Sequence, residues 1–549
     1  MKDILSGAFT GTPEGHNIQM LYPLSWCISV FYKFNHTLPW YGYFLTGCHF
    51  LCFFLIINRL ESFFVSNFSK AVVAVMCVWG ILALHLSDLV FVQYTITSAI
   101  MGATAIFLLF TTDAKLPGRQ FISHNIISIV LVIIAFQLRT EMLLLIFPMI
   151  GLAGLFKWSL EAKIFDIRNV KKYMLLISVI IIGMVLSEIV NMAAYGDASW
   201  KEFYQLFDNR TELYDFQKIP SYEEHQSFYE SIGMRQSEQA LLENYDYGID
   251  ESIDADAMGK VADYAGEISH SDQNIMGKLQ ESIIKYIRLL LLRDHTDVQW
   301  NIVICMEYIA AIILIGMIRK YYEIWKLIVL GLVRSGLWLF IVYRNRIPVR
   351  ISHSLYLTEM LLLLALILVM WSSNRNSLRA DIEKKCSKII VIAVLTGGLF
   401  IFMGNYSRTA YEMMRRENLN TPYWELQNYC STHKDSFYFL DIYSVSAYSE
   451  KMFVNVDNSL RNYDYLGGWA CKSPADKEKL EAYGITDIED AILNNKKVYV
   501  VSKVERSMEW IENYFNEKGI EINVMLEDSI EDNGEALFGI YQIRNLDVK

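Results

Sequence analysis

Long runs without ionisable side chains are the feature that most limits how this chain can fold. Residues 71–84, 126–136, 174–186 and 389–403 contain no Asp, Glu, Lys or Arg. Hydrophobic residues make up 53% of the sequence and charged residues 20%, so the charges are segregated from the apolar runs. Runs of this length fit helices through a bilayer. The sequence therefore predicts a polytopic α-helical membrane protein with about ten transmembrane helices, near residues 41–59, 70–87, 96–112, 122–138, 141–157, 172–191, 300–318, 324–343, 354–372 and 387–404.

The loops between these predicted helices differ in charge. The two most basic connections follow residue 157 and residue 372, and they contain Lys157, Lys163, Arg168, Lys171, Lys172, Arg375, Arg379, Lys384, Lys385 and Lys388. Basic loops stay in the cytoplasm. Counting the spans outward from these loops puts the N-terminus and both long soluble segments on the outer face. The predicted location is the plasma membrane, with the large soluble segments extracytoplasmic.

Five parts follow from this topology. Residues 1–40 form an outer loop and a surface amphipathic helix, and 41–191 hold about six transmembrane helices. An acidic extracytoplasmic loop domain spans 192–299, with a surface helix predicted at 275–292. About four more transmembrane helices occupy 300–404, and an extracytoplasmic α/β domain occupies 405–549. In that domain the runs 436–440, 497–501, 520–525 and 537–543 predict strands, and 505–518 predicts a helix.

The first 40 residues are unusual, because they would cross the membrane ahead of the first predicted span. No signal peptide precedes them in the sequence. Either a further helix precedes Met1 in the complete protein, or the N-terminus faces outward without one. The segment contains Asp3, Glu14 and His16 among glycines and turn-forming residues. An acid held there could act as a general base, and the alternative is ordinary loop chemistry.

Arginines at the outer surface run against the positive-inside pattern. Arg344, Arg346 and Arg350 lie in one predicted outer turn, with His353 beside them. A guanidinium pairs with phosphate oxygens in bidentate fashion, so this trio predicts a site for a phosphate or diphosphate headgroup. The alternatives are a turn neutralised by the acidic outer segment, or arginines that rest on lipid phosphates.

Other charges lie close to, or inside, the predicted membrane helices. Arg139 and Glu141 share a tight outer turn, where they form either a structural ion pair or part of a ligand site. Glu307 and Arg334 lie at matching depth on adjacent helices and are interpreted first as a structural pair. Glu359 is a further candidate for lining a cavity. Together with His16, Glu307 and Arg334 it completes the predicted cavity-lining set.

Several classes of site receive no support from the sequence. No soluble stretch combines clustered Lys and Arg with exposed aromatics, so nucleic acid is not an expected partner. No zinc-type spacing occurs, and the sequence neither indicates nor excludes a divalent metal cofactor. Cys430 and Cys471 share the tail domain, where a disulfide between them is one of two open alternatives.

Several short motifs, taken together, resemble one known family. They are the loop 6–16 (Ser-Gly-Ala-Phe-Thr-Gly-Thr-Pro-Glu-Gly-His) with Tyr22-Pro23-Leu24 after it, Gln93-Tyr94-Thr95, Leu138-Arg139 and Arg346-Ile347-Pro348-Val349-Arg350. The pattern is similar to the GT-C superfamily of membrane glycosyltransferases, in the bacterial branch of protein O-mannosyltransferases and aminoarabinose transferases. The resemblance implies a GT-C-like fold and a polyprenyl-phosphate-linked sugar donor. It also implies an acid in the first outer loop that acts as base or metal ligand. Only Asp3 and Glu14 match that role here, because the helix and acidic pair expected before them are absent from the sequence.

The resemblance leads to one expected function and two rivals. The expected activity is transfer of a sugar from a polyprenyl-phosphate donor to an acceptor hydroxyl on a glycan, lipid or protein at the outer face. In that scheme Asp3 and Glu14 are the candidate catalytic acids, and Arg344, Arg346, Arg350 and Arg139 bind the donor phosphate. The first rival is a non-enzymatic transporter or lipid flippase for envelope precursors, with buried charges lining its pathway. The second is a cell-surface polymer ligase or polymerase.

Overall fold

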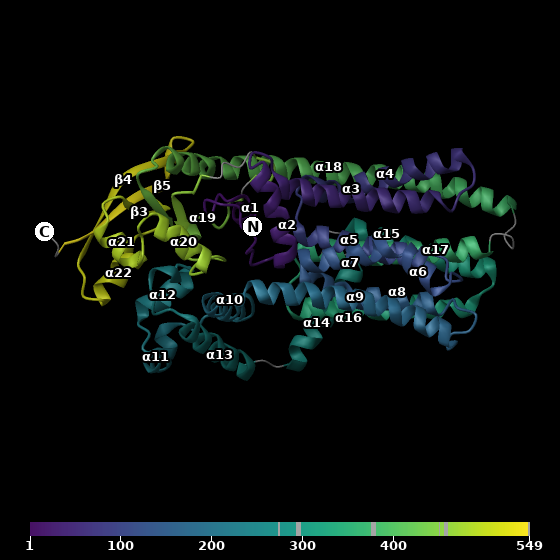
Figure 1. Ribbon diagram of the computed structural model, residues 1–549, viewed down its shortest axis with the longest axis horizontal. Helices are drawn as coiled ribbons and strands as arrows, with labels where there is room; N and C mark the ends of the chain where they lie inside the picture. The colour runs from purple at the N-terminus through teal and green to yellow at the C-terminus, as the bar shows by residue number, and fades with distance from the viewer. Residues whose placement is uncertain (273–274, 292–297, 375–379, 450, 455–458, 547–549) are drawn as a thin grey trace.

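The computed structural model describes residues 1–549 apart from 273–274, 292–297, 375–379, 450, 455–458 and 547–549. The molecule is elongated, with a bundle of long helices at one end and the soluble parts gathered at the other (Figure 1). Arg375 and Arg379 of the predicted basic loop lie outside the described residues.

Apolar helices make up the bundle. Nine of the described helices are long and apolar enough to cross a membrane, and a tenth is counted if the bent pair α6–α7 forms one span. They are α3 (Trp40–Glu61), α4 (Asn67–Val90), α5 (Tyr94–Thr111), α6 (Gly118–His124), α7 (Ile126–Leu138), α8 (Thr140–Trp158), α9 (Ile167–Ala194), α15 (Val298–Ile318), α16 (Ile324–Tyr343), α17 (Val349–Asn374) and α18 (Ala380–Thr432). The predicted set of long apolar helices is confirmed, and their insertion into a membrane stays a prediction.

Helix α5 lies at the centre of the bundle. It packs against α3, α7, α8 and α17, and nearly all of its residues are buried. Gly102 makes the contact with α8 close, because a Cβ atom there would lie 2.6 Å from Cδ1 of Ile146. Small and hydroxyl side chains allow such close approach between helices in a bilayer. By contrast, α9 and α18 bury few of their side chains, as expected of helices that face lipid.

Short helices and one sheet form the soluble end. The segment after α9 folds there into α10 (Ala198–Phe216), α11 (Tyr222–Ser231), α12 (Gln236–Asn244), η1 (Tyr247–Ile249) and α13 (Ala255–Asp272). The next helix, α14 (Ile275–Leu290), packs instead against α16 of the bundle. The core of the segment is shared with the tail, since Leu241 and Tyr247 belong to the same buried cluster as Phe437 and Phe439. The two soluble segments therefore form one body at one end of the bundle (Figure 1).

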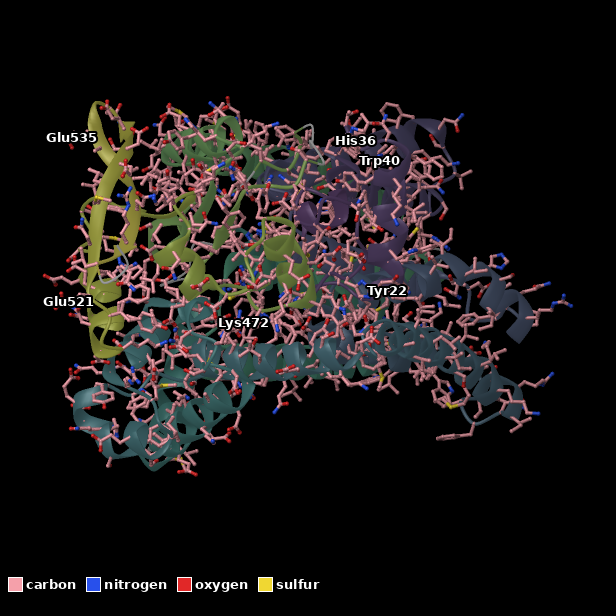
Figure 2. All side chains as sticks on the ribbon, turned by 60° about the vertical axis from the view of Figure 1, so that its left-hand side comes forward. Tyr22, His36, Trp40, Lys472, Glu521 and Glu535 are labelled. Carbon is pink, nitrogen blue, oxygen red and sulfur yellow. The ribbon has the colours of Figure 1, made fainter. Side chains whose placement is uncertain are left out.

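The tail carries a five-stranded mixed sheet of order β2-β1-β3-β5-β4. Its strands are β1 (Phe437–Leu440), β2 (Tyr463–Tyr465), β3 (Val498–Lys503), β4 (Ile522–Asp532) and β5 (Glu535–Asn545). β1 runs parallel to β2 and β3, whereas β5 is antiparallel to β3 and β4. Helices α19 (Ile442–Val445), α20 (Pro474–Ala482), α21 (Ile488–Asn494) and α22 (Glu509–Glu517) complete this part. Glu521 and Glu535 lie on the hairpin at the outer edge, far from Trp40 at the start of α3 (Figure 2).

Two boundaries differ from the sequence prediction. The predicted division between membrane helices and tail at residue 404 falls inside α18, which continues without a break to Thr432. Ion pairs from Glu412 to Arg415 and Arg416, three and four residues apart, support the helix beyond its apolar part. Strand β2 was not predicted, because it is only three residues long.

The N-terminal segment contacts both the helix bundle and the tail. Helix α1 (Lys2–Ser6) and the loop after it lie against the tail, where the backbone N–H of Arg461 donates to the carbonyl of Ala8 at 3.2 Å. Helix α2 (Tyr22–Phe34) then packs against α3, α7 and α9 of the bundle. A helix was predicted at this position, and the structure adds that the preceding loop bridges bundle and tail.

The two tail cysteines do not form a disulfide. Both are free and buried, and they belong to different core clusters. Burial raises the pKa of the Cys430 thiol to about 12 and that of Cys471 well above its usual value. These thiols are therefore packing residues, which settles the alternative left open by their spacing.

Candidate functional site

Two adjoining cavities lie where the bundle meets the soluble end. The larger, of about 1200 Å³, is here called the aromatic cavity, and the smaller, of about 820 Å³, the cationic cavity. Val92, Gln93, Lys451 and Met452 line both, so the two spaces share a wall. Gln93 stands at the start of α5, where its side-chain oxygen caps the helix by accepting from the backbone N–H groups of Thr95 and Ile96. The central helix therefore begins at the junction of the two cavities.

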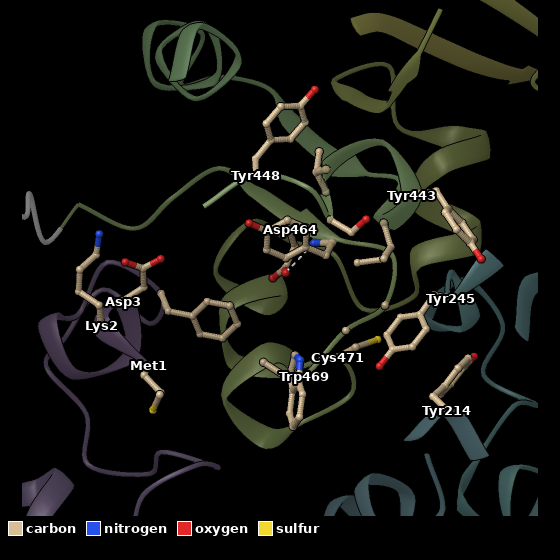
Figure 3. Close-up of a pocket in the computed structure, with 18 of the residues that line it drawn as sticks. Met1, Lys2, Asp3, Tyr214, Tyr245, Tyr443, Tyr448, Asp464, Trp469 and Cys471 are labelled. Carbon is tan, nitrogen blue, oxygen red and sulfur yellow. Dashed lines mark hydrogen bonds between the residues drawn. The ribbon is translucent and has the colours of Figure 1, made fainter. Parts of the chain in front are cut away.

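Loops at the carboxyl ends of parallel strands form one wall of the aromatic cavity. Residues 442–448 follow β1 and residues 467–471 follow β2, and members of both groups line the space. Ligands of open α/β sheets bind at this edge, outside the carboxyl ends of the strands. The opposite wall comes from α1 and from the segment around α10 and α12. Figure 3 shows Met1, Lys2 and Asp3 on one side, Tyr214 and Tyr245 on the other, and Trp469 between them.

Rings dominate the lining of this cavity. The aromatic lining residues are Phe9, Tyr41, Tyr94, Tyr214, Tyr245, Tyr423, Tyr443, Tyr448, Tyr465 and Trp469. Trp469 is 49% exposed and Tyr443 57% exposed, so flat ring faces are open to a ligand. Behind the wall, the buried guanidinium of Arg210 lies 4.4 Å from the Trp469 ring and 5.6 Å from that of Tyr245. Such rings with nearby polar groups suit a ligand that has both apolar and polar faces.

Two carboxylates of the aromatic cavity, those of Asp3 and Asp464, are ion-paired. Oδ2 of Asp3 lies 2.5 Å from Nη1 of Arg461, whose guanidinium also donates to the Tyr463 hydroxyl at 2.7 Å. Asp464 lies 2.9 Å from the ammonium of Lys479. The structure therefore places Asp3, the first of the two predicted catalytic acids, in a cavity wall, and a tail arginine holds it there.

The cationic cavity is bounded by α4, α15, α17 and α18. Its lining includes four cationic side chains, Arg350, Arg408, Arg416 and Lys451. Three carboxylates, Asp88, Glu412 and Glu417, also line it. Glu412 forms ion pairs with Arg415 and Arg416, each at 2.7 Å. Asp88 pairs with His85 and His353, each at 3.0 Å. Arg350 has no ion pair within the described part of the chain, and its side chain is exposed.

The predicted arginine trio does not act as one group. Arg346 forms an ion pair with Asp215 at 3.0 Å, and both Arg344 and Arg346 lie over the ring of Phe216. Only Arg350 reaches a cavity. The split follows from the backbone, because α17 begins at Val349: Arg350 is on the helix, whereas the other two precede it. Arg344 and Arg346 thus anchor the soluble end, as in the alternative of a turn neutralised by the acidic outer segment.

The predicted outer turn at Arg139 holds a structural pair. Nε of Arg139 lies 3.1 Å from Glu141, and its Nη1 donates to Gln19 at 2.5 Å. The guanidinium also lies 5.4 Å from the ring of Tyr94, which lines the aromatic cavity. Arg139 therefore supports the cavity from behind and is not among its lining residues.

Glu14 and His16 form a pair of their own beside α9 and α10. Their side chains meet at 2.7 Å, and the His16 ring stacks on Trp200 at 5.2 Å. The hydrogen bond from His16 lowers the pKa of Glu14 to about 2. Burial opposes protonation of His16, but the bond and charge of Glu14 outweigh it, so the pKa of His16 is raised. Neither residue lines the two cavities.

The buried charges of the bundle pair differently from the prediction. Nε of Arg334 lies 3.0 Å from Glu359, and its Nη2 donates to Asn301 at 2.5 Å. The hydroxyl of Tyr308 donates to Glu359 at 2.9 Å. The predicted pair of Glu307 and Arg334 is wrong, since matching depth along two helices does not fix which side each residue faces. Oε2 of Glu307 is buried without a hydrogen-bond partner among the described residues.

Comparison with known protein families, with curated proteins and with solved structures finds no match for this chain. The likeness of its motifs to GT-C glycosyltransferases therefore stays a prediction. Within the residues described, no group of three His, Cys, Asp or Glu side chains is arranged to hold a metal ion.

Sequence reasoning missed most of the cationic cavity. Arg408, Arg416 and Lys451 were assigned to a soluble tail, although charges spaced four residues apart after an apolar run indicate a helix that continues. Asp88 and His353 were also missed as a pair. They meet at 3.0 Å from positions 265 residues apart, and no local pattern could have joined them.

Proposed function

We propose that this chain is an integral membrane glycosyltransferase. It moves a sugar from a polyprenyl-phosphate-linked donor to an acceptor hydroxyl at the outer face of the membrane. The observation that carries the proposal is the wall shared by two cavities at the end of an apolar bundle. One contains Arg350, which has no ion pair among the described residues, and the other is lined by aromatic rings. A lipid-linked anion and a hydroxyl acceptor each find a matching surface, and the two surfaces adjoin.

The donor phosphate belongs in the cationic cavity. Arg350 is the guanidinium available for it, with Arg408, Arg416 and Lys451 around the same space. Preorganised positive charge at the departing phosphate stabilises the transition state. The lipid chain would continue along α4 and α18, between which Val75, Val78, Trp79, Leu395 and Leu399 line an apolar cavity of about 540 Å³.

The acceptor belongs in the aromatic cavity, with Asp3 as the base. Its hydroxyl oxygen attacks the anomeric carbon on the face opposite the phosphate, and the configuration inverts. Asp3 lines the cavity, where its carboxylate is placed to take the hydroxyl proton. Glu14 is not proposed as the base, because it lies outside the cavity.

The sidedness rests on the charge of the loops. Helices α8 and α9 are joined at the end of the bundle away from the sheet (Figure 1). That connection contains Lys163, and Arg168 lies at the start of α9 directly after it; both are exposed. The positive-inside rule places this end in the cytoplasm and the two cavities outside.

The rival class is a transporter or lipid flippase, and one observation favours it. Glu307, Arg334 and Glu359 are charged groups inside the bundle, and such groups often mark a pathway. The same residues do not line either cavity, so the glycosyltransferase is the conclusion that the geometry supports better.

Transfer of a radiolabelled sugar from a polyprenyl-phosphate-linked donor, in membranes that contain the full chain, tests the proposal. The variant Arg350→Ala should lower transfer by about 10²-fold. Arg344→Ala is the matched control, because it removes a nearby guanidinium that lies outside the cavities, and it should leave transfer within about twofold. Equal transfer by wild type and Arg350→Ala would overturn the phosphate role. Movement of the intact lipid-linked sugar between leaflets, without transfer, would establish the flippase instead.

A further inference from the structure

A buried arginine without a counter-charge lies behind the wall of the aromatic cavity. Arg210 of α10 is 2% exposed, and its Nε and Nη1 have no hydrogen-bond partner among the described residues. Its contacts are with aromatic rings, and no carboxylate forms an ion pair with it in the part of the chain that the structure describes. A guanidinium stays charged in a protein, and a buried charge without a partner is costly. Such a residue needs an explanation.

Three rings surround this guanidinium. Its central carbon lies 5.0 Å from the ring of Phe207, 5.6 Å from that of Tyr245 and 4.4 Å from that of Trp469. The negative faces of such rings compensate a cation only in part. Tyr245 and Trp469 also line the aromatic cavity, so only these rings separate the charge from the cavity. Burial raises the pKa of Tyr245 and the charge of Arg210 opposes that rise, which shows that the charge acts at the cavity wall.

The other charges of the cavity wall do not cancel that of Arg210. The lining carboxylates are those of Asp3, Asp464 and Glu243, and the lining lysines are Lys2, Lys218 and Lys451. Two of the carboxylates are already ion-paired with cations behind the wall. Glu243 is exposed, so solvent screens its charge, whereas a buried charge is screened much less. The wall is therefore positive on balance and favours a ligand that carries negative charge.

Trp469 offers that ligand a preformed ring surface. Arg210 and the ring of Phe207, whose centroid is 5.5 Å away, pack on it from behind, and half of the side chain stays exposed to the cavity (Figure 3). The loop before it is tightly packed, because a Cβ atom at Gly467 would overlap the carbonyl oxygen of Tyr245. Tyr245 itself has a φ of 66°, and such backbone strain persists only where the surroundings hold it. The position of the Trp469 ring is thus fixed before a ligand arrives.

Polar side chains that suit hydroxyl groups adjoin the rings. Glu243 and Asn244 end α12 directly before Tyr245, and both line the cavity. The backbone carbonyl of Glu243 accepts a hydrogen bond from the hydroxyl of Tyr443 at 3.2 Å, so the second exposed ring is tied to the same turn. A sugar has flat C–H faces and a rim of hydroxyls, so it can stack on a ring while a carboxylate and an amide bind its rim. A peptide would instead add to the free edge of a strand, whereas this wall consists mainly of loops at strand ends.

We propose that the aromatic cavity binds an acidic glycan, a sugar chain with negatively charged groups, and that Arg210 determines the preference for the acid. That this glycan is the acceptor of transfer rests on the proposed function, whereas its binding does not. One sugar stacks on Trp469, and its charged group lies at the wall in front of Arg210. Arg210 acts through the ring and does not touch the ligand. A buried unit charge roughly 8 Å away favours an anion over a neutral group by about tenfold.

Calorimetric titration of the full chain in nanodiscs, without any sugar donor, tests the inference. The two probes are β-1,4-linked tetraglucuronate and its neutral counterpart, which has CH₂OH in place of each carboxylate. Wild type should bind the acidic probe about tenfold more tightly than the neutral one. Trp469→Ala should weaken the binding of both probes by about tenfold, because the stacking surface is lost.

Substitutions of Arg210 separate its charge from its packing. Arg210→Met keeps an unbranched apolar side chain of similar length, so the neutral probe should bind as before while the preference for the acidic probe falls below about twofold. Arg210→Lys restores the positive charge and should keep most of the preference. Arg235→Met is the matched control, because Arg235 is an exposed arginine of the same segment that does not line the cavity. It should leave both affinities unchanged.

The outcomes distinguish this inference from the proposed function. Equal affinity of wild type for the two probes would overturn the preference for an acid, and binding of neither probe would overturn the glycan site. A tetra-aspartate peptide bound as tightly as tetraglucuronate would assign the cavity to an acidic peptide instead. A full preference in Arg210→Met would remove the role of Arg210. If the preference depends on Arg210 but the chain transfers sugar to no acceptor, the binding site stands and the proposed function fails. If sugar is transferred equally fast to the acidic and the neutral probe, the function stands and this inference fails.

Discussion

Asp3 of α1 and Arg461 of the tail form an ion pair at 2.5 Å across 458 positions of the chain. The pair fixes the N-terminal segment in the wall of the aromatic cavity. Met1, Lys2 and Ile4 line the same wall. The cavity is therefore assembled from both ends of the sequence, and its shape depends on this contact.

Loss of the Asp3–Arg461 pair should loosen the N-terminal segment. In Arg461→Gln, Asp3 keeps its charge but loses a cation, and local stability should fall by about 1–3 kcal/mol. Faster hydrogen exchange at residues 4–14 measures the change. The exposed pair Arg415–Glu412 provides a matched control, because Arg415→Gln removes a 2.7 Å contact at the surface and should leave exchange at residues 4–14 unaltered. Unchanged exchange in Arg461→Gln would contradict the proposed role of the pair.

The Glu14–His16 pair should give the protein a stability optimum in mildly acidic solution. Because the pKa of Glu14 is lowered from 4.5 to about 2, its contribution is present above pH 4.5 and is lost as the pH falls toward 2. The pKa of His16 is raised from 6.5, so its contribution is complete below pH 6.5 and is lost as the pH rises through the raised value. The thermal unfolding temperature, measured across pH, should fall on both the acid and the alkaline side of this optimum. In Glu14→Gln the unfolding temperature should depend less on pH, and a pH dependence equal to that of the wild type would argue against the pair.

The buried pair Arg334–Glu359 should be sensitive to single substitutions. Arg334→Met leaves a carboxylate that is 1% exposed without its cation, which costs about 3–5 kcal/mol. The double variant Arg334→Met with Glu359→Leu removes both charges and should recover most of the loss. Unfolding in a denaturing detergent measures all three proteins. A double variant as unstable as the single one would show that packing, and not charge, is what the substitution disrupts.

Accessibility labelling should find the soluble end outside the cell. Lys163 and Asp435 are both exposed, one in the connection of α8 and α9 and the other before β1. A cysteine placed at Asp435 should react with a membrane-impermeant reagent in intact cells, and one placed at Lys163 should react only after lysis. The reverse pattern would put both cavities in the cytoplasm and remove the outer-face transfer.

The sequence was sufficient to predict the long apolar helices and most strands, because each depends on local patterns. Hydropathy over 18 or more residues marks a bilayer helix, and alternating β-branched and aromatic residues mark strands such as β3 and β5. The continuation of α18 past residue 404 was missed because its polar part resembles a soluble segment in composition. Ion pairing three and four residues apart was the available signal.

The site could be predicted only in part, for a physical reason. Arg344, Arg346 and Arg350 are close in sequence and chemically equal, yet the start of α17 at Val349 separates their environments. Glu307 and Arg334 lie at the same depth along their helices. The direction in which each side chain points around its helix axis differs, however, and Arg334 pairs with Glu359 instead. Contacts such as Asp88 with His353 depend on how distant helices pack, and a single sequence does not encode that arrangement in any short pattern.

Photo-crosslinking with a polyprenyl phosphate tests the central claim most directly. The probe carries a photoreactive group on the isoprene unit next to the phosphate, and the labelled peptides of the purified protein are identified by mass spectrometry. We expect labels on α4, α17 and α18 around Asp88, Arg350 and Arg408, and we expect these labels to be lost in Arg350→Ala. Labels confined to the opposite end of the bundle, around Lys163, would contradict it.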